Sequence, residues 1–313
     1  MKKIIYFIIL LLLILLTADR SISFVLDKIY SKIKTGQTGG KINYYLSMDT
    51  LPEILIMGDS RAFYQINPDS FKMKTYNLSH AGMGQSFQTG LLNVLDQEKK
   101  LPPIILLHIN LEEYIKNEAA ENPFDVQNLK YYHGKNKLVT DYIDEISEFE
   151  KYKYYFELYR YNGRVINLVK NLIETKQTND FGNGYIAVGA GDRDSINIVL
   201  YAEKETENKS AVFNYDRLKH LNKFLEICIR NKVKLICFTS PFYNKWNFNI
   251  TASNVLDSVF KTKNIEYINY AVQPVPMLEK HPFFWKDTGH LNHHGAKIES
   301  GDLSKQVNEI LKK

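Results

Sequence analysis

Short apolar runs that end in turn residues recur along most of the chain, as buried parallel strands do. Five such runs cover residues 53–58, 75–78, 103–110, 233–239 and 265–269. Helical periodicities at residues 215–231 and 252–263 precede the fourth and fifth runs. Strands that alternate with helices form a parallel sheet covered on both faces. We therefore predict an α/β fold, a flavodoxin-like three-layer sandwich with a central parallel sheet of about five strands.

The first twenty residues carry a different pattern. Two lysines precede the apolar run of residues 4–16, and an Asp-Arg pair at 19–20 ends it, as in export or insertion signals. The run is short for a full span, which needs roughly 17 to 25 apolar residues. Residues 16–18 make a poor cleavage site because leucine is bulky at the first position. We favour an uncleaved transmembrane anchor over a removed signal peptide, with the N-terminus cytoplasmic and the rest extracytoplasmic.

The predicted parts are a transmembrane signal anchor (1–20), a Lys-rich tether (21–50) and one α/β domain (51–313). Residues 116–211 fit the alternation of strands and helices poorly, and we interpret them as an inserted helical and loop region within the domain. They contain helical patterns at 141–161 and 164–175 and a glycine-rich loop at 179–191. The insertion is either a lid or substrate-shaping wall, or a surface elaboration without a direct role.

Composition narrows the class of protein. Hydrophobic residues at 44% and charged residues at 24% are typical of a globular chain. The excess of 40 Lys and Arg over 35 Asp and Glu is spread along the chain, so it is no nucleic-acid footprint. Tyrosines cluster between Tyr114 and Tyr161. We interpret them as residues at the half-buried edges of amphipathic helices, in preference to a surface that stacks on sugars. Cys228 and Cys237 provide no disulfide framework, and two buried thiols are favoured over a bridge.

A serine stands directly after the first predicted strand, in the turn Gly58-Asp59-Ser60-Arg61. Parallel α/β sheets bind ligands at the carboxyl ends of their strands, so this position suits a nucleophile. Capping of the following helix by Asp59 or Ser60 is the plainer interpretation.

An acid stands three residues before a histidine near the C-terminus, in Asp287-Thr-Gly-His290. A tight turn lets such a carboxylate bind one ring nitrogen and leaves the other for a hydroxyl. A solvated loop histidine, or a helix cap by Asp287, is the alternative. Together with Ser60, the pattern predicts a nucleophile, a base and its orienting acid.

Two further elements follow the second and third predicted strands. Gly82 ends the motif Asn77-Leu-Ser-His-Ala-Gly82, and Asn110 ends the third strand. A backbone N–H at Gly82 and the amide of Asn110 beside Ser60 would form an oxyanion hole. They could equally be a turn glycine and a strand-end cap, but all four elements fall at the same edge of the predicted sheet.

These elements resemble the four ordered blocks of the SGNH (GDSL-like) hydrolase superfamily. The resemblance covers roughly residues 51–115 and 232–298, and the stretch from His290 to Ala296 is similar to the terminal motif of membrane-anchored SGNH-like proteins of bacterial envelopes. It implies Ser60 as nucleophile, His290 as base and Asp287 as its partner. It also implies Gly82 and Asn110 as oxyanion donors, and ester or acetyl-transfer chemistry on carbohydrate.

The chain departs from the family pattern at two places. The third block reads His108-Ile-Asn110-Leu111 and lacks the glycine and the trailing acid of Gly-x-Asn-Asp. Arg61 replaces the leucine of the GDSL form. Asp59, Arg61 and His108 stand beside the motifs and are candidate substrate-binding residues.

Five histidines are expected near this edge of the sheet: His80, His108, His290, His293 and His294. A metal site is disfavoured because no pair of helical histidines with a nearby glutamate completes a hydrolytic zinc pattern. Instead, residues 292–294 are expected to open the C-terminal helix, with Gly295 and Ala296 allowing close packing on the sheet. No metal and no cofactor are predicted.

The sequence thus predicts an extracytoplasmic serine esterase acting on acyl esters, above all O-acetyl esters, of envelope glycans. An O-acetyltransferase with the same triad is one alternative, and a non-catalytic SGNH-like scaffold or glycan-binding protein is another. The expected partners are an acylated glycan or other ester substrate and the membrane, reached through the N-terminal helix. Nucleic acid is not expected, and the sequence identifies no protein partner.

Overall fold

The structure is a computed structural model, and it describes residues 1–116, 125–173, 182–189, 197–199, 212–243, 247–279 and 281–313. The chain forms two compact units, Met1–Ser47 with Val126–Asp180 and Met48–Asp125 with Phe181–Lys313. Each unit is described separately below.

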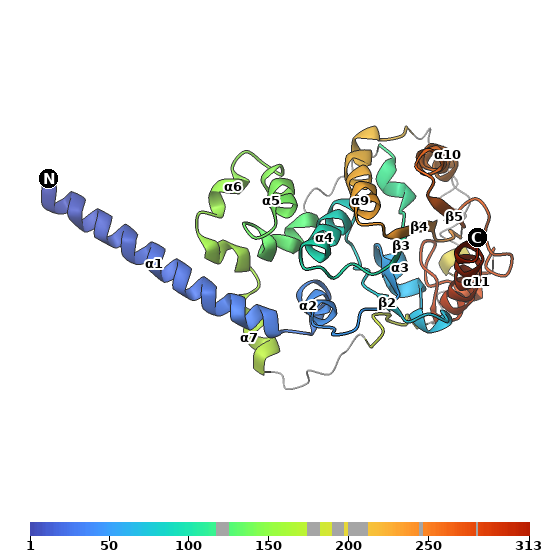
Figure 1. Cartoon of the computed structure of the whole chain (residues 1–313), viewed down its shortest axis with the longest axis horizontal. Coiled ribbons are helices and arrows are strands. Elements are labelled where there is room, and N and C mark those ends of the chain that lie inside the picture. Colours follow the sequence, from blue (N-terminus) through green and yellow to red (C-terminus); the bar gives the residue numbers. More distant parts are fainter. Residues whose placement is uncertain (117–124, 174–181, 190–196, 200–211, 244–246, 280) are drawn as a thin grey trace. The chain divides into compact units, whose positions relative to one another are not determined.

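A five-stranded parallel sheet organises the second unit (Figure 1). Its strands are β1 (Ile54–Met57), β2 (Thr75–Asn77), β3 (Ile104–His108), β4 (Lys234–Thr239) and β5 (Glu266–Asn269). The strand order is β2-β1-β3-β4-β5, and every neighbouring pair is parallel. This is the flavodoxin-like order, so the predicted fold class and strand number are confirmed.

Helices cover both faces of the sheet. They are α3 (Ser60–Gln65), α4 (Gln85–Gln97), α9 (Leu218–Arg230), α10 (Asn247–Thr262) and α11 (His293–Leu311), with 3-10 turns η2 (Pro68–Ser70), η3 (Leu111–Tyr114), η6 (Tyr215–Arg217) and η7 (Pro282–Phe284). Helix α4 packs against α9 on one side, and α3 packs against α11 on the other (Figure 1). Alternate strand residues such as Ile54, Leu106 and Phe238 share one buried cluster with Ala62 and Leu303, which lie on α3 and α11. The mostly apolar sequences of the central strands β1, β3 and β4 follow from this burial on both faces.

The first unit is helical. Its elements are α1 (Lys2–Lys32), the π-helical turn η1 (Gly36–Gly40), α2 (Lys41–Leu46), α5 (Lys137–Asp144), α6 (Glu150–Lys153), η5 (Glu157–Tyr161) and α7 (Val165–Ile173), together with η4 (Asp125–Tyr132), which begins at the boundary. Leu26, Tyr30 and Ile33 form a small core with Tyr161 and Leu168. The side chain of Asn43 donates to the carbonyls of Tyr30 and Ile33 and so satisfies the end of α1.

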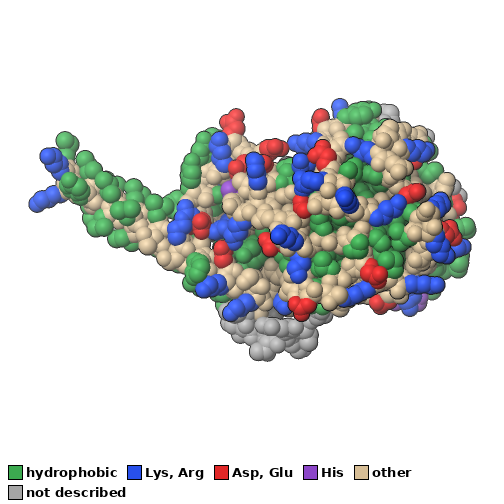
Figure 2. All heavy atoms as spheres, viewed as in Figure 1, with side chains coloured by type: hydrophobic (Ala, Val, Ile, Leu, Met, Phe, Trp, Pro, Cys, Tyr) green, Lys and Arg blue, Asp and Glu red, His purple; other side chains and the backbone are tan. Residues whose placement is uncertain are grey.

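The N-terminal helix is long and apolar enough to cross a membrane, a property that it shares with signal sequences. Hydrophobic side chains cover its surface, and basic side chains lie at its tip (Figure 2). Residues 21–46, predicted as part of a tether, are mostly helical. The predicted division into anchor, tether, domain and insertion stays a prediction.

Both cysteines are buried free thiols, as predicted. Cys228 lies on α9 and Cys237 on β4. Burial raises the pKa of the Cys228 thiol to about 12, which makes it a weak nucleophile.

Candidate active site

Ser60 lies at the turn between β1 and α3. Gly58 has a φ of +152°, and a Cβ there would lie 2.5 Å from the Cβ of His108, so only glycine fits. Asp59 caps the helix by accepting a 3.0 Å hydrogen bond from the backbone N–H of Arg61. Ser60 is therefore the first residue of α3, at the carboxyl edge of the sheet.

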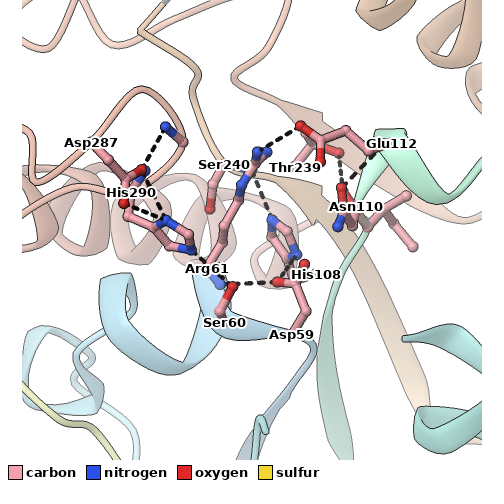
Figure 3. A network of polar contacts seen from close by, with 12 residues as sticks. Asp59, Ser60, Arg61, His108, Asn110, Glu112, Thr239, Ser240, Asp287 and His290 are labelled. Atoms are coloured by element: carbon pink, nitrogen blue, oxygen red, sulfur yellow. Dashed lines mark hydrogen bonds and ion pairs between the residues drawn. The ribbon is translucent and has the colours of Figure 1, made fainter. Parts of the chain in front are cut away.

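The structure brings Ser60, His290 and Asp287 together (Figure 3). The Oγ of Ser60 lies 2.9 Å from Nε2 of His290 across 230 residues of sequence. The Nδ1 of His290 lies 3.0 Å from both carboxylate oxygens of Asp287. Because an ionised carboxylate only accepts hydrogen bonds, Nδ1 carries the proton of the neutral ring. The lone pair of Nε2 then faces the hydroxyl of Ser60.

A tight loop holds Asp287 in this position. Its Oδ1 accepts hydrogen bonds from the backbone N–H groups of Gly289 (2.8 Å) and His290 (2.7 Å). Burial alone would raise the pKa of Asp287, but its contacts with His290 and these N–H groups lower it. The side chain of Gln65 donates to the carbonyl of Gly289 and ties the loop to α3. Asp287 is thus kept as an anion beside the imidazole.

Asn292 opens the C-terminal helix, as predicted. Its Oδ1 accepts hydrogen bonds from the backbone N–H groups of His294 and Gly295. A Cβ on Gly295 would lie 2.3 Å from the carbonyl oxygen of Phe284, so this glycine allows close packing, here against η7.

Ser60, Gly82 and Asn110 line one cavity of about 210 Å³. The full lining is Asp59, Ser60, Gly82, Met83, Gly84, Asn110, Glu113, Asp125 and Arg217. Gly82 has a φ of +74° in the turn closed by the bond from Met83 N–H to the His80 carbonyl. Asn110 caps η3 by accepting from the N–H of Glu112 through Oδ1, a bond that does not use its amide nitrogen.

Asn77 supports this edge of the sheet. Its side-chain nitrogen donates to the carbonyls of Ala62 (2.7 Å) and Ile66 (2.9 Å), and its Oδ1 accepts from the N–H of Ser79 (3.0 Å). The residue is fully buried. Asn77 therefore joins the end of α3 to the segment that leads to Gly82.

Behind Ser60, His108 connects Asp59 to β4 (Figure 3). Its Nδ1 lies 3.0 Å from Oδ1 of Asp59, and its Nε2 accepts a hydrogen bond from the N–H of Ser240. The second bond assigns the ring proton to Nδ1. Burial would raise the pKa of Asp59, but His108 and Arg61 hold it well below its usual range.

Arg61 extends away from the cavity. Its Nη2 lies 3.3 Å from Glu112, and its guanidinium stacks 3.6 Å from the ring centre of Phe242. Arg61 and His108 are both buried. Of the three candidate substrate-binding residues, the cavity lining includes Asp59 alone. A role in substrate binding stays a prediction for all three.

Two acidic residues of the cavity were not identified from the sequence. Glu113 accepts a 2.9 Å hydrogen bond from the N–H of Gln85, and Asp125 accepts a 2.9 Å bond from the N–H of Gly84. A Cβ on Gly84 would lie 2.9 Å from an oxygen of each acid, so both carboxyl groups meet at the start of α4. Burial raises the pKa of Glu113 to about 8, and the nearby charges of Asp59 and Asp125 add to this. Burial therefore favours the protonated, neutral form of Glu113 near neutral pH.

The sequence contained different amounts of information about the cavity residues Glu113, Asp125 and Arg217. Glu113 stands three residues after Asn110, so the end of the third strand already marked its neighbourhood. Asp125 and Arg217 lie in segments without a strand or a motif. Only tertiary structure could place them beside Ser60.

The histidines near this edge have separate contacts. His293 pairs through Nδ1 with the hydroxyl of Tyr185, His294 stacks on Phe283, and His80 packs against Phe87. Within the described ranges, no group of three or more His, Cys, Asp or Glu side chains is arranged to hold a metal ion.

Part of the predicted insertion lies beside the candidate site. The carbonyl of Asn183 accepts from the N–H of Asn77, and the carbonyl of Val188 accepts from the N–H of His293. Residues 182–189 therefore connect the edge strand β2 to the start of α11, close to His290. Residues 126–180 of the insertion belong to the first unit. The choice between a lid and a surface elaboration stays open.

No family model matches the chain, and no curated protein matches it. Among solved structures, the chain is similar to a protein from Bacteroides fragilis NCTC 9343 that is provisionally named an acylhydrolase. The two share 14% sequence identity and a TM-score of 0.39, over 82% of this chain and 87% of the other. A likeness of this degree carries no argument about activity, which rests on the geometry above.

Proposed function

We propose that this protein is a serine esterase of the SGNH type that acts on small acyl esters, above all O-acetyl esters of envelope glycans. The proposal rests on one observation, the 2.9 Å approach of Ser60 Oγ to His290 Nε2 with Asp287 on the opposite ring nitrogen. A hydroxyl, a base and an orienting acid in this order are the parts of an activated serine nucleophile.

In the proposed reaction, Nε2 of His290 takes the proton of Ser60 as Oγ attacks the ester carbonyl. The carbonyl oxygen becomes an oxyanion, for which the backbone N–H of Gly82 and the side-chain amide of Asn110 are the proposed donors. His290 then returns the proton to the leaving alkoxide, and an acyl-serine remains. Water, activated by the same imidazole, attacks the acyl carbon and regenerates Ser60.

The cavity supports a small and polar substrate. Its volume of about 210 Å³ lies below the roughly 300 Å³ at which pockets for drug-sized ligands begin. Asp59, Glu113, Asp125 and Arg217 contribute to the lining, and such groups suit hydroxyl-rich ligands better than a fatty acyl chain. An acetyl group on a sugar agrees with both properties. The envelope location rests on the candidate membrane helix α1.

The test uses the full chain in detergent micelles and measures acetate release from an O-acetylated glycan and from an activated acetyl ester. Replacement of Ser60 by alanine should abolish release, and so should His290→Gln. Ser258→Ala is the matched control, because Ser258 lies on α10 and its hydroxyl only bonds the Asn254 carbonyl within that helix. A folded wild-type protein that releases no acetate, and whose Ser60 is not labelled by a fluorophosphonate, would refute the proposal.

The same assay separates hydrolysis from transfer. The acyl-serine can be attacked by a sugar hydroxyl instead of water, which would make the protein an O-acetyltransferase. A non-acetylated glycan is added with the acetyl donor, and the products are measured by mass spectrometry. Ser60-dependent acetyl on the added glycan would assign transfer, and free acetate alone would assign hydrolysis.

A further inference from the structure

The apolar run of α1 is too short to span a bilayer by itself. Residues 4–16 are exposed apolar positions, apart from Tyr6, and they extend only about 20 Å as a helix. The hydrocarbon core of a bilayer is about 30 Å thick. About 10 Å of apolar height is missing before the charged pair Asp19 and Arg20.

Residues of the first unit bind both charged side chains. Both carboxylate oxygens of Asp19 accept backbone N–H groups, from Glu157 at 2.8 Å and from Leu158 at 3.0 Å, and Asp19 is 3% exposed. Arg20 pairs with Asp19 and Glu157 and donates to the carbonyl of Tyr155. Because Asp19 is buried and hydrogen-bonded, and the half-exposed Arg20 is paired, the helix can enter a less polar environment past residue 20.

Exposed apolar side chains lie near the contacts of Asp19 and Arg20, both on α1 and on residues 149–169. On α1, Ile22, Phe24 and Val25 are exposed, which extends the apolar surface to residue 25 and the apolar length to about 33 Å. Residues 149–169 of the first unit also carry exposed apolar side chains: Phe149, Tyr152, Tyr155, Phe156, Val165, Ile166 and Val169. We call these ten side chains the collar. Scattered exposed apolar residues are ordinary, but a concentration of aromatic ones beside a membrane helix is not.

The collar includes an apolar groove. The groove has a volume of about 720 Å³ and is lined by Ile22, Leu26, Lys153, Phe156, Leu158, Tyr159, Asn162, Gly163 and Val165. One basic side chain, Lys153, lines the groove, and its ammonium group pairs with Glu150 at 2.6 Å. A mostly apolar groove beside an exposed apolar helix matches the acyl region of a bilayer.

We propose that the collar inserts into the interface of the bilayer that α1 spans, with lipid acyl chains in the groove. The bonds from Asp19 and Arg20 hold Tyr155 and Phe156 at the level where the apolar run of α1 ends. Tyrosine and other aromatic residues are enriched at that depth in membrane proteins. The collar thus supplies the apolar height that residues 4–16 lack, and it makes the first unit a membrane-embedded element. This inference is independent of the esterase proposal.

The test places a fluorescent label at single cysteines in the full chain, reconstituted in vesicles of phosphatidylcholine and phosphatidylglycerol. Cys228 and Cys237 are buried, so an added surface cysteine is labelled selectively. The variants are Tyr155→Cys and Ile166→Cys in the collar. Ile229→Cys is the control, because Ile229 is 58% exposed on α9 of the second unit. Both collar labels should show blue-shifted emission and lose most of it to lipids with a nitroxide near the top of the acyl chain, while the control label responds only to aqueous iodide.

Three results would overturn the proposal. Collar labels that respond to iodide like the control would place the collar in water. Labels shielded from both lipid nitroxide and iodide would show that protein, such as a second copy of the chain, covers the collar. A chain that loses α1 by cleavage and no longer floats with the vesicles would show that no membrane helix holds the collar at a bilayer.

Discussion

Replacing Glu113 by glutamine should remove a large pH-dependent cost from the stability of the second unit. Burial raises the pKa of Glu113 from 4.5 to about 8. In the folded protein the carboxyl group therefore keeps its proton up to about pH 8, whereas in the unfolded chain it loses the proton near pH 4.5. Between these values the folded state binds the extra proton, so this group lowers the free energy of unfolding as pH rises. The difference in pKa corresponds to roughly 5 kcal/mol in full.

Glutamine has no proton to lose, and its amide oxygen can still accept the N–H of Gln85. The stability of Glu113→Gln relative to the wild type should therefore increase from pH 5 to pH 8 by up to roughly 4 kcal/mol and then level off. Glu299 is also fully buried, with its pKa raised to about 8, but it is present in both proteins and cancels from the difference.

The measurement is urea unfolding of the full chain in micelles at several pH values between 5 and 9. Trp285 is 1% exposed and lies in the second unit, so its fluorescence reports on the sheet domain. Glu98→Gln, at the exposed end of α4, controls for the change in net charge. Parallel stability curves for Glu113→Gln and the wild type over this range would show that Glu113 is not a buried neutral acid.

Three further results are expected. Asp287→Asn should leave the fold intact and lower kcat for ester hydrolysis by about 10²- to 10⁴-fold, because the imidazole of His290 loses its orienting acceptor; an unchanged kcat would contradict the triad. Asn77→Ala should lower the free energy of unfolding by about 2 to 4 kcal/mol, measured in urea, because three buried hydrogen bonds are lost. Cys228 and Cys237 should react with a thiol reagent only at the rate of unfolding, and a faster reaction in the native protein would contradict their burial.

Local patterns were sufficient to predict the sheet of the second unit. The five strands begin and end within two residues of the predicted runs. The central strands β1, β3 and β4 are mostly apolar because they are buried on both faces, whereas the edge strands β2 and β5 carry polar residues. Helix α10 was harder to delimit: the predicted periodicity began at Ala252, whereas the helix begins at Asn247, where polar residues precede the apolar ones. Burial determines the strand pattern, but a helix start depends on weaker polar signals.

The candidate site shows why some of its residues could be predicted and others could not. Ser60, Gly82 and Asn110 each follow a strand, and parallel strands bring their carboxyl ends to one edge, so topology alone places these three residues together. Asp125 follows no strand, and its pairing with the start of α4 depends on a path that local sequence does not encode. Burial chiefly raises the pKa of Glu113, and the nearby charges of Asp59 and Asp125 add to it.

Local sequence was also insufficient to predict the contacts of the N-terminal helix. From the sequence, Asp19 and Arg20 marked the end of the apolar segment, because an unpaired charge is costly in a membrane. The structure pairs Asp19 with backbone N–H groups 138 and 139 residues away, and it pairs Arg20, whose side chain is 48% exposed, with Glu157. A hydropathy profile treats every charged residue as unpaired, because it contains no information about tertiary contacts. Where a distant segment pairs such charges, the apolar length available to a membrane depends on tertiary structure, and in the proposed collar this length extends to Val25.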